Sequence, residues 1–284
     1  MFSPEPSSSF ITALYAQDEL AITSRLTLNA GLRYDHYSTF GGTTNPRLGL
    51  IYRPAEKTTL KLLYGKAFRA PDVFETSPDF GVFYDDNPTL RPERIKSLEA
   101  RVEQGLGRYF QLSSGVYRNR IDNLITLVSN SADGNFQYQN VGSAEATGMD
   151  VEFSGRATSG LQGKASLDYV DAHNLGDGNP LLDNSPRHMA KLDLIVPLVH
   201  QQLFASAEGQ FLGRRLTLLQ DSLSSYQIFN VTLLGHTFGK HMDMAASIFN
   251  VLDKKYFDPG RPEDPEDAIQ QDGRSFRVKI TGRF

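Results

Sequence analysis

The feature that most constrains this chain is an alternation of apolar and polar side chains that recurs along its whole length. In residues 25–37, RLTLNAGLRYDHY, one face carries Leu, Ala and Tyr, while the other carries Arg, Thr, Asn and Asp. Successive side chains of a β-strand point to opposite faces, so such a segment predicts a strand with one apolar and one polar face. The same pattern recurs near residues 58–69, 109–120, 149–156, 162–171, 202–212, 227–235 and 275–284.

The predicted strands are long. They run to roughly 9–12 residues, whereas strands of soluble proteins most often have about 5–6. A tilted strand that crosses a membrane needs about 9–11 residues. Their apolar faces carry Leu, Val, Phe and Tyr, and their opposite faces carry many charges. An outer-membrane barrel requires this arrangement, with lipid outside and water inside. A soluble β-sandwich module is the alternative that alternation alone leaves open.

The predicted connections alternate between long and short. Outer-membrane barrels show this asymmetry, with tight periplasmic turns and long external loops. A soluble meander has no physical reason to keep its long loops on one edge. The long connections are 38–45, 70–93, 121–143, 172–186, 214–225 and 252–273, and the short ones are 22–24, 54–57, 105–108, 157–160, 197–201 and 236–241.

Composition argues against several other kinds of site and partner. The net charge of −4 is spread along the chain without a basic block, so we expect no nucleic acid partner. Cys is absent, which excludes a disulfide framework, a thiolate metal site and a cysteine nucleophile. No run approaches the ~18 apolar residues of a membrane helix. The start, MFSPEPSSSF, has no features of a signal peptide.

The fold class predicted from these observations is all-β: a transmembrane antiparallel barrel with about 13 strands in this chain. Bacterial single-chain barrels normally have an even number of strands, and an open edge in lipid leaves unpaired amides. The odd count therefore suggests that strands upstream are missing. We expect a short N-terminal segment, residues 1–9, before the barrel portion at residues 10–284.

Several motifs occur in a consistent order. They are YGKAFRAP at residues 64–71, NPTLRPERIKSLE at 87–99, YQNVGSAEATGMDVE at 138–152, NSPRHMAKL at 184–192 and FNVLDKKYFDPG at 249–260. Together with a final strand that ends in Phe284, this ordered set resembles the barrel of TonB-dependent outer-membrane receptors. The matches span roughly residues 12–284.

The resemblance implies more than the barrel. Family members have a barrel of about 22 strands that encloses a globular plug. The plug precedes the barrel and contacts the energy-transducing TonB–ExbB–ExbD system. Neither plug nor TonB-contacting segment is visible in this sequence, and Met1 falls at a position that corresponds to about the tenth strand of such a barrel. The resemblance also implies contact with lipid, lipopolysaccharide and the barrel-assembly machinery, which reads a terminal signal here formed by Phe276 and Phe284.

Candidate ligand-binding residues cluster in the long connection 70–93. Its segment FGVFYDD places Phe80, Phe83 and Tyr84 beside Asp85 and Asp86. Aromatic faces beside polar groups can stack on a flat ligand and orient it. The alternative is that these aromatic rings pack against neighbouring loops.

Arg69 is a further ligand-binding candidate, at the end of the strand before this connection. Its simplest role is a lumen-facing charge paired with a carboxylate such as Glu99. The prolines of the motifs, Pro71, Pro88 and Pro92, are expected outside strands, because proline cannot donate to a ladder. The motifs are therefore expected to form strand-end architecture more often than binding sites.

Metal binding and catalysis gain little support. The six His residues show no tight ligand spacing, and residues 72–86 hold no His between the two motifs where haem-importing relatives carry one. The acidic connection 261–272 lacks the regular Asp spacing of a calcium loop. We expect no metal site, no cofactor and no enzymatic activity. His188 near Ser185 is the one close pair that a hydrolase at the barrel rim could use.

The function expected from pattern and resemblance is active import across the outer membrane of a Gram-negative-type bacterium. The ligand would be a scarce nutrient captured by external loops, most often in this family a ferric siderophore. Vitamin B12, a glycan or another metal chelate or small ligand remain open. The main alternative is a passive porin-like channel without a plug.

Overall fold

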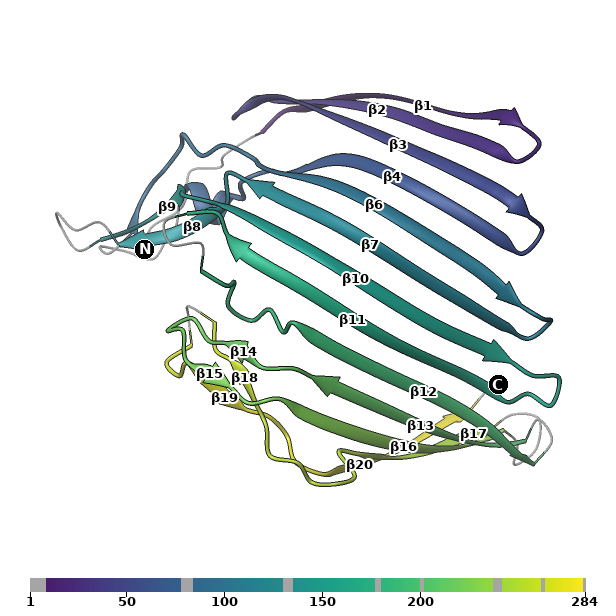
Figure 1. Ribbon diagram of the computed structural model, residues 1–284. Helices are drawn as coiled ribbons and strands as arrows, with labels where there is room; N and C mark the ends of the chain where they lie inside the picture. Colours follow the sequence, from purple (N-terminus) through teal and green to yellow (C-terminus); the bar gives the residue numbers. More distant parts are fainter. Residues whose placement is uncertain are drawn as a thin grey trace.

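One antiparallel sheet of 13 strands dominates the computed structural model (Figure 1). The structure describes residues 9–77, 84–129, 135–176, 180–199, 202–236, 242–261 and 264–282. Sheet neighbours follow the order of the chain, which confirms the expected strand number and the all-β fold. The strands are β1 (Ile11–Thr23), β2 (Leu26–Tyr37), β3 (Gly41–Ala55), β4 (Thr58–Arg69), β6 (Glu93–Leu106), β7 (Phe110–Asp122), β10 (Ser143–Arg156), β11 (Gln162–Asn174), β12 (His188–Val199), β13 (Leu203–Leu212), β16 (Tyr226–His236), β17 (Met242–Phe249) and β20 (Ser275–Gly282).

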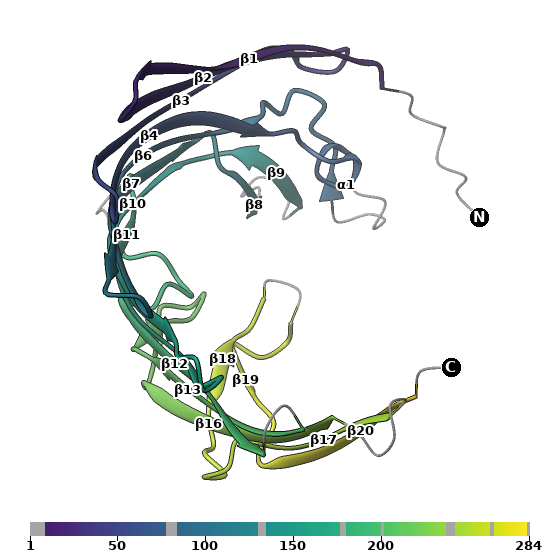
Figure 2. The same cartoon turned by 90° about the vertical axis from the view of Figure 1, so that its right-hand side faces the viewer.

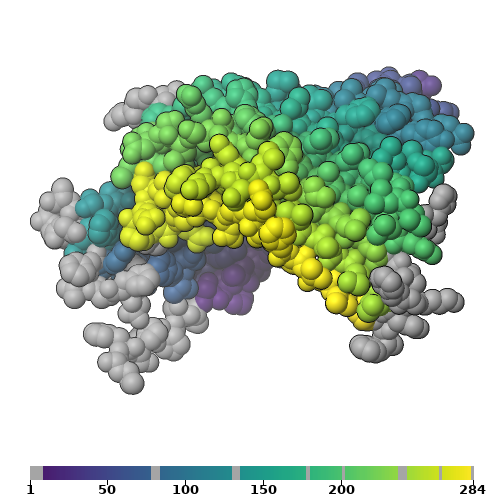
Figure 3. Space-filling model, turned by 90° about the horizontal axis from the view of Figure 1, so that it is seen from below, coloured from purple at the N-terminus to yellow at the C-terminus, as the bar shows by residue number. Residues whose placement is uncertain are grey.

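The sheet curls into an open arc with β1 and β20 at its two ends (Figure 2). A sandwich consists of two sheets packed face to face. Among the residues described, this single curved sheet has no second large sheet against it, so the sandwich alternative is wrong. Figure 3 shows the C-terminal residues, in yellow, as a strip beside the green strands that precede them.

The convex face of the arc is apolar. Partners directly opposite each other on neighbouring strands share a face. Leu28, Leu50 and Leu62 form one such row across β2, β3 and β4, and Ala100 of β6 continues it. Large apolar side chains of this face remain exposed on most strands, among them Leu14, Leu32, Leu48, Leu98, Val116, Leu167, Leu192, Val231, Phe276, Val278 and Ile280. A face of this kind requires lipid around it.

The concave face is polar and carries ion pairs within and between strands. These pairs join Lys61 to Glu103, Arg101 to both Glu99 and Asp150, and Lys164 to Glu152, at 2.5–2.8 Å. Across the middle of these strands, most charges and apolar residues therefore lie on opposite faces, as the alternation predicts. Few apolar side chains are fully buried among the described residues: Leu90, Ala144, Ala172, Leu212 and Tyr226, which lie in or near the longer connections.

Connections of two kinds occupy the two edges of the sheet. At one edge, residues 24–25, 56–57, 107–109 and 157–161 join strands by tight turns. At the other edge, the connections contain α1 (Val73–Thr76), β5 (Tyr84–Asp85), β8 (Ile125–Ser129), β9 (Phe136–Asn140), β14 (Arg215–Leu216), β15 (Ser222–Leu223), β18 (Phe257–Pro259) and β19 (Ala268–Gln270). Figure 1 shows the labelled ones among them, β8, β9, β14, β15, β18 and β19, on the same side.

One connection differs from the prediction. Residues 38–45 are not a long loop, because β2 ends at Tyr37 and β3 already begins at Gly41. Gly41 has a φ of +86°, a conformation that glycine adopts without steric cost, and it closes a short hairpin. β3 then runs through Pro46, which pairs with Leu32 of β2 beyond the point where β4 stops pairing. A proline is tolerated there because only one neighbouring strand needs a hydrogen bond.

The motif prolines lie where the sequence places them. Pro71, Pro88 and Pro92 are all outside strands. Phe276 lies in β20 on the apolar face, opposite Ile248. Phe284 lies outside the described residues. Within the described ranges, no helix is long and apolar enough to cross a membrane.

Candidate functional site

The candidate site lies at the edge of the sheet with the long connections. We call α1, β5, β8 and β9, with the residues that join them to the wall, the first loop cluster. Strands β5, β9 and β8 form a small separate sheet, in which β5 is parallel to β9. In Figure 2 these elements lie inside the arc. Two connections far apart in the sequence thus meet over the lumen.

Arg69 fixes the first loop cluster to the wall. Its guanidinium donates two hydrogen bonds to the Glu75 carboxylate, at 2.9 and 2.8 Å, and its Nε donates to Glu93 at 2.6 Å. The expected pairing of Arg69 with Glu99 is wrong. The antiparallel register places Arg69 opposite Glu93, while Glu99 lies opposite Leu63, deeper in the wall. Glu99 pairs with Arg101 instead.

The local sequence positions Glu75 for its ion pair with Arg69. Asp72 caps α1 by accepting from the Glu75 backbone N–H at 2.7 Å, and the Glu75 side chain accepts from the Asp72 backbone N–H at 3.0 Å. This reciprocal pair is a capping box, which satisfies donors that a short helix cannot pair internally. Glu75 is buried, at 9% exposure. The Asp-x-x-Glu spacing was the sequence signal for this residue, and pattern reasoning missed it.

Two asparagines join the first connection to the second. Asn140, at the end of β9, accepts from the Arg91 backbone N–H at 2.8 Å, and its amide donates to the carbonyls of Arg91 and Asn123 at 2.9 Å. Asn87 donates to the Tyr138 carbonyl at 2.8 Å. Both asparagines belong to the motifs found in the sequence. The motifs therefore serve as connectors between loops, as the architectural interpretation expected.

The described members of the predicted aromatic cluster are held by neighbours in the same loops. The rings of Tyr84 and Phe136 lie 5.8 Å apart. Asp85 accepts from the Asn135 side-chain amide at 2.9 Å, and the Asp86 carbonyl accepts from Gln137. Packing against neighbouring loops, the alternative for these residues, thus occurs at Tyr84. Phe80 and Phe83 lie outside the described residues.

The ion pairs of the first loop cluster lie beyond the apolar band of the wall. On the convex face, the apolar rows end with Tyr64 opposite Leu98, and the next row is Lys66 opposite Lys96. Arg69 and Glu93 come later still. Burial alone would raise the pKa of Glu93, but hydrogen bonds from Arg69 and from the Ile125 backbone N–H lower it below its usual range. The carboxylate is therefore charged and paired at neutral pH.

A second loop cluster occupies the same edge further along the sheet. It consists of β14, β15, β18 and β19, and the buried Arg215 is its centre. Arg215 donates to the Phe257 carbonyl at 2.9 Å and pairs with the Asp258 carboxylate. Its guanidinium also lies 5.4 Å from the ring centre of Tyr226 at the start of β16. Sequence reasoning missed this cluster because its members are far apart in the chain.

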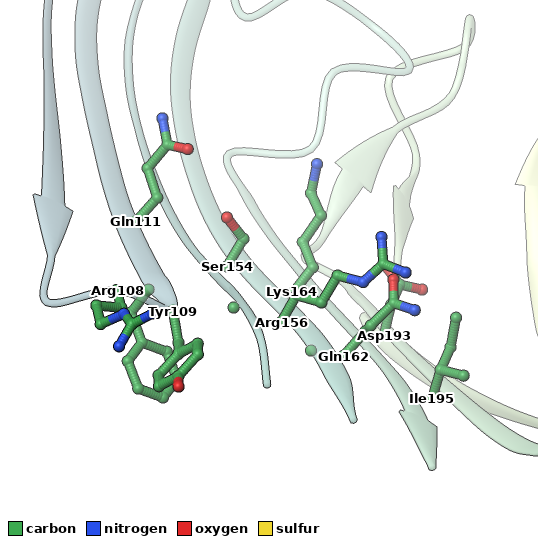
Figure 4. A pocket seen from close by; sticks show the side chains of 12 residues that line it. Arg108, Tyr109, Gln111, Ser154, Arg156, Gln162, Lys164, Asp193 and Ile195 are labelled. Atoms are coloured by element: carbon green, nitrogen blue, oxygen red, sulfur yellow. The ribbon is translucent and has the colours of Figure 1, made fainter. Parts of the chain in front are cut away.

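The opposite edge has a different surface. A hollow of about 480 Å³ opens there on the concave face, near the turns 107–109 and 157–161. Figure 4 shows Gln111, Ser154 and Lys164 projecting to the same side of three neighbouring strands. These side chains belong to the wall itself, because the tight turns add no further elements over the hollow.

The described part of the chain gives little support for a metal site or a catalytic site. Across these residues, no group of three or more His, Asp or Glu side chains is arranged to hold a metal ion. The His188 ring packs at 5.2 Å from Tyr169 on the neighbouring strand, where the two residues are direct partners.

Comparison with known proteins supports the fold described above. Residues 3–251 match the model of the TonB dependent receptor-like β-barrel family. Among curated relatives, the chain is 24% identical to a ferric enterobactin receptor of Pseudomonas aeruginosa, over 98% of this chain and 43% of that protein. It is 30% identical to the vitamin B12 transporter BtuB of Vibrio cholerae, over 81% of this chain and 36% of that protein. The chain thus spans less than half the length of these relatives.

Solved structures show the same fold. A mutant of the ferric enterobactin receptor of P. aeruginosa superposes with a TM-score of 0.79 at 22% identity, covering 98% of this chain and 45% of that one. The ferric-catecholate import receptor Fiu of Escherichia coli gives a TM-score of 0.76 at 16% identity, with 97% and 45% covered. The chain therefore belongs to the TonB-dependent receptor family, as part of its outer-membrane β-barrel.

Proposed function

We propose that this chain forms part of the barrel of a receptor that imports a ferric siderophore through the outer membrane, energised by TonB–ExbB–ExbD. The observation that carries the proposal is the inward fold of the first loop cluster over the lumen at one edge (Figure 2). Side-chain contacts hold that cluster to the wall and join its two connections to each other. A rigid, partly covered lumen entrance is suited to capturing a bulky ligand before transport.

Family membership supports the class of function. The family consists of non-enzymatic transporters, in agreement with the expectation that the chain is not an enzyme. The siderophore is supported by relatives that are named for ferric enterobactin, both in sequence and in structure. Vitamin B12 is the second candidate, because a cobalamin transporter shares the higher identity of 30% over a shorter part of the chain.

Within the site, we assign ligand contact to the connection 70–93 and the lumen wall below it. Tyr84, Asp85 and Asp86 lie on the described part of this connection, and Phe80 and Phe83 complete the proposed aromatic surface. Arg69 acts mainly through Glu75 and Glu93, because both carboxylates already occupy its guanidinium. We therefore propose Arg69 as a positioning residue rather than a direct ligand contact.

Uptake by the native gene in a host that lacks it tests the proposal. Cells that express the protein should accumulate radiolabelled iron from a ferric catecholate siderophore, and deletion of tonB should abolish the accumulation. Cobalamin uptake in place of iron uptake would select the second candidate. Accumulation that persists without TonB would support the passive channel and contradict active import.

A further inference from the structure

The hollow at the turn edge carries cations that the protein leaves unpaired. Three cationic side chains line it: Arg108 in the turn, Arg156 at the end of β10 and Lys164 of β11. Lys164 pairs with Glu152 at 2.7 Å. Arg108 and Arg156 are exposed, and neither forms an ion pair with any residue that the structure describes. Two guanidinium groups of the hollow are therefore available to bind an anion.

The strand register brings these cations to one place. Gln111, Ser154 and Lys164 are direct partners on β7, β10 and β11, so they share the concave face. Arg156 lies two residues beyond Ser154, on the same face and opposite Gln162. Arg156 and Lys164 are therefore diagonal neighbours, at a spacing that long side chains can bridge. Figure 4 shows both side chains at the hollow, on neighbouring strands.

One step deeper along the same strands, the charges of the wall balance one another. An adjoining hollow of about 410 Å³ shares Gln111 and Ser154 with the hollow at the turn edge. Its cations, Lys61 and Arg101, each pair with carboxylates at 2.5–2.8 Å. In this part of the wall, charge is thus balanced inside the lumen and unbalanced at the turn edge.

The remaining lining suits a flat, anionic ligand. The Arg108 guanidinium lies 6.0 Å from the ring centre of Tyr109, which is 41% exposed. A guanidinium plane and an aromatic ring can both stack on an aryl group. Asp193 is the carboxylate of the lining, so the cations outnumber it. A volume of about 480 Å³ lies within the range of small-molecule sites, about 300–1,000 Å³.

We propose that this hollow is an exit subsite, in which Arg108 and Arg156 bind the anionic iron chelate as it leaves the lumen on the periplasmic side. The inference rests on the proposed function, in which the turn edge faces the periplasm. A ferric catecholate matches the hollow, because its deprotonated oxygens outweigh the charge of the iron and its aryl rings are flat. Guanidinium groups bind such oxygens through charge-assisted hydrogen bonds. Exposed ion pairs are weak, so the subsite can hold the ligand and still release it.

The test uses the full-length native protein purified in detergent, with iron(III) tris-catecholate as the probe. Ser159→Cys, in the turn after β10, carries a fluorophore that bound iron quenches at short range. The test variant adds Arg108→Gln and Arg156→Gln. The matched control adds Arg25→Gln and Arg53→Gln, which removes the same charge from exposed arginines of the turn edge that do not line the hollow. Heat-modifiable migration on a gel confirms that each barrel is folded.

We expect saturable quenching in the unsubstituted protein and in the control alike. The half-saturating concentration should be about three- to tenfold higher in the test variant, since each exposed ion pair contributes up to about fivefold. Raised salt should weaken the quenching, and cobalamin, which lacks net charge, should not compete. Capture at the loop edge should keep its affinity in every variant, because other residues form that site.

Equal half-saturating concentrations in the two double variants, or effective competition by cobalamin, would overturn the exit subsite. Iron uptake by cells without saturable quenching of the purified protein would overturn the exit subsite alone. Absence of iron uptake would overturn the proposed function and the exit role with it. If the double variant does not fold, Arg156→Gln alone, which breaks no ion pair of the described structure, must still raise the half-saturating concentration at least about twofold.

Discussion

The two edges of the same sheet are built in contrasting ways. At the turn edge, neighbouring strands are joined by a few residues, and the backbone ladder is the main connection. At the loop edge, small extra elements are held to the wall and to each other by Arg69, Asn87, Asn140 and Arg215. The loop edge thus depends on single side chains to a degree that the turn edge does not.

This difference has a physical origin. In lipid, every backbone group of the wall must be paired within the sheet, which leaves the strands little freedom to vary. The loops lie beyond the apolar band and can use side-chain hydrogen bonds, which allow many shapes. We therefore expect binding specificity to reside at the loop edge, and substitutions there should separate ligand capture from barrel assembly.

The largest effect is expected for Arg69→Ala. It leaves the carboxylates of Glu75 and Glu93 close together without their shared cation, at a cost of about 1–3 kcal/mol for a partly exposed group. Hydrogen exchange should quicken in residues 84–90 and 123–129 of the assembled protein, and ligand affinity should fall. Arg101→Ala is the matched control, because Arg101 also bonds two carboxylates but lies in the wall. Equal exchange in the two variants would contradict the role of Arg69.

Asn140→Ala should have a smaller effect on the same loops. It removes two hydrogen bonds between the two connections and one within the second, each of which contributes about 0.5–1.5 kcal/mol. Exchange should increase at residues 91 and 123–129 while α1 keeps its protection. Asn119→Ala provides the comparison, because Asn119 bonds only Ser97 within the wall. Faster exchange in α1 would mean that Asn140 and Arg69 hold one unit and not two separate contacts.

Replacing Phe83 and Tyr84 by Ala together tests the proposed aromatic surface. Each aromatic contact typically contributes about 0.5–1.5 kcal/mol beyond burial, so ligand affinity should fall several-fold per ring, as measured by titration of the purified receptor. Substitutions in the turn 105–108 should leave affinity unchanged. A turn variant that loses binding, beside an aromatic variant that keeps it, would invert the assignment of the two edges.

The smallest effect is expected when the pH is lowered. The pKa of Glu93 is lowered in the folded protein, so its contribution to stability is present above the unfolded pKa of about 4.3 and is lost as the pH falls through the folded value. Exchange in residues 123–129, which include the bonded Ile125 amide, should be steady near neutral pH and quicken selectively below the ordinary glutamate range. The turn at 107–109 should show no such selective change. Parallel changes at both edges would indicate general acid unfolding.

The sequence predicted the wall well and the loops poorly. In a wall with lipid on one side and water on the other, alternating side chains can be arranged in only one way. The strand number, the two faces and most connections were therefore predictable. The prediction of a long loop at 38–45 was wrong, because Gly41 allows a tight turn that the loop-like composition does not reveal. Arg69 was placed correctly at a strand end, but its partner depends on register, which composition does not encode. Arg215 and Asp258 are 43 positions apart, and only the fold brings them together.

The central claim is that the loop edge faces the outside of the cell and captures the ligand. The chain contains no Cys, so single cysteines can be introduced without background. Leu175→Cys and Leu219→Cys place an exposed thiol at the loop edge, and Glu56→Cys and Arg108→Cys place one at the turn edge. In intact cells, a membrane-impermeant thiol reagent should label the first pair, and label the second pair only after the outer membrane is disrupted. Labelling of the turn pair in intact cells, with the loop pair protected, would contradict the account.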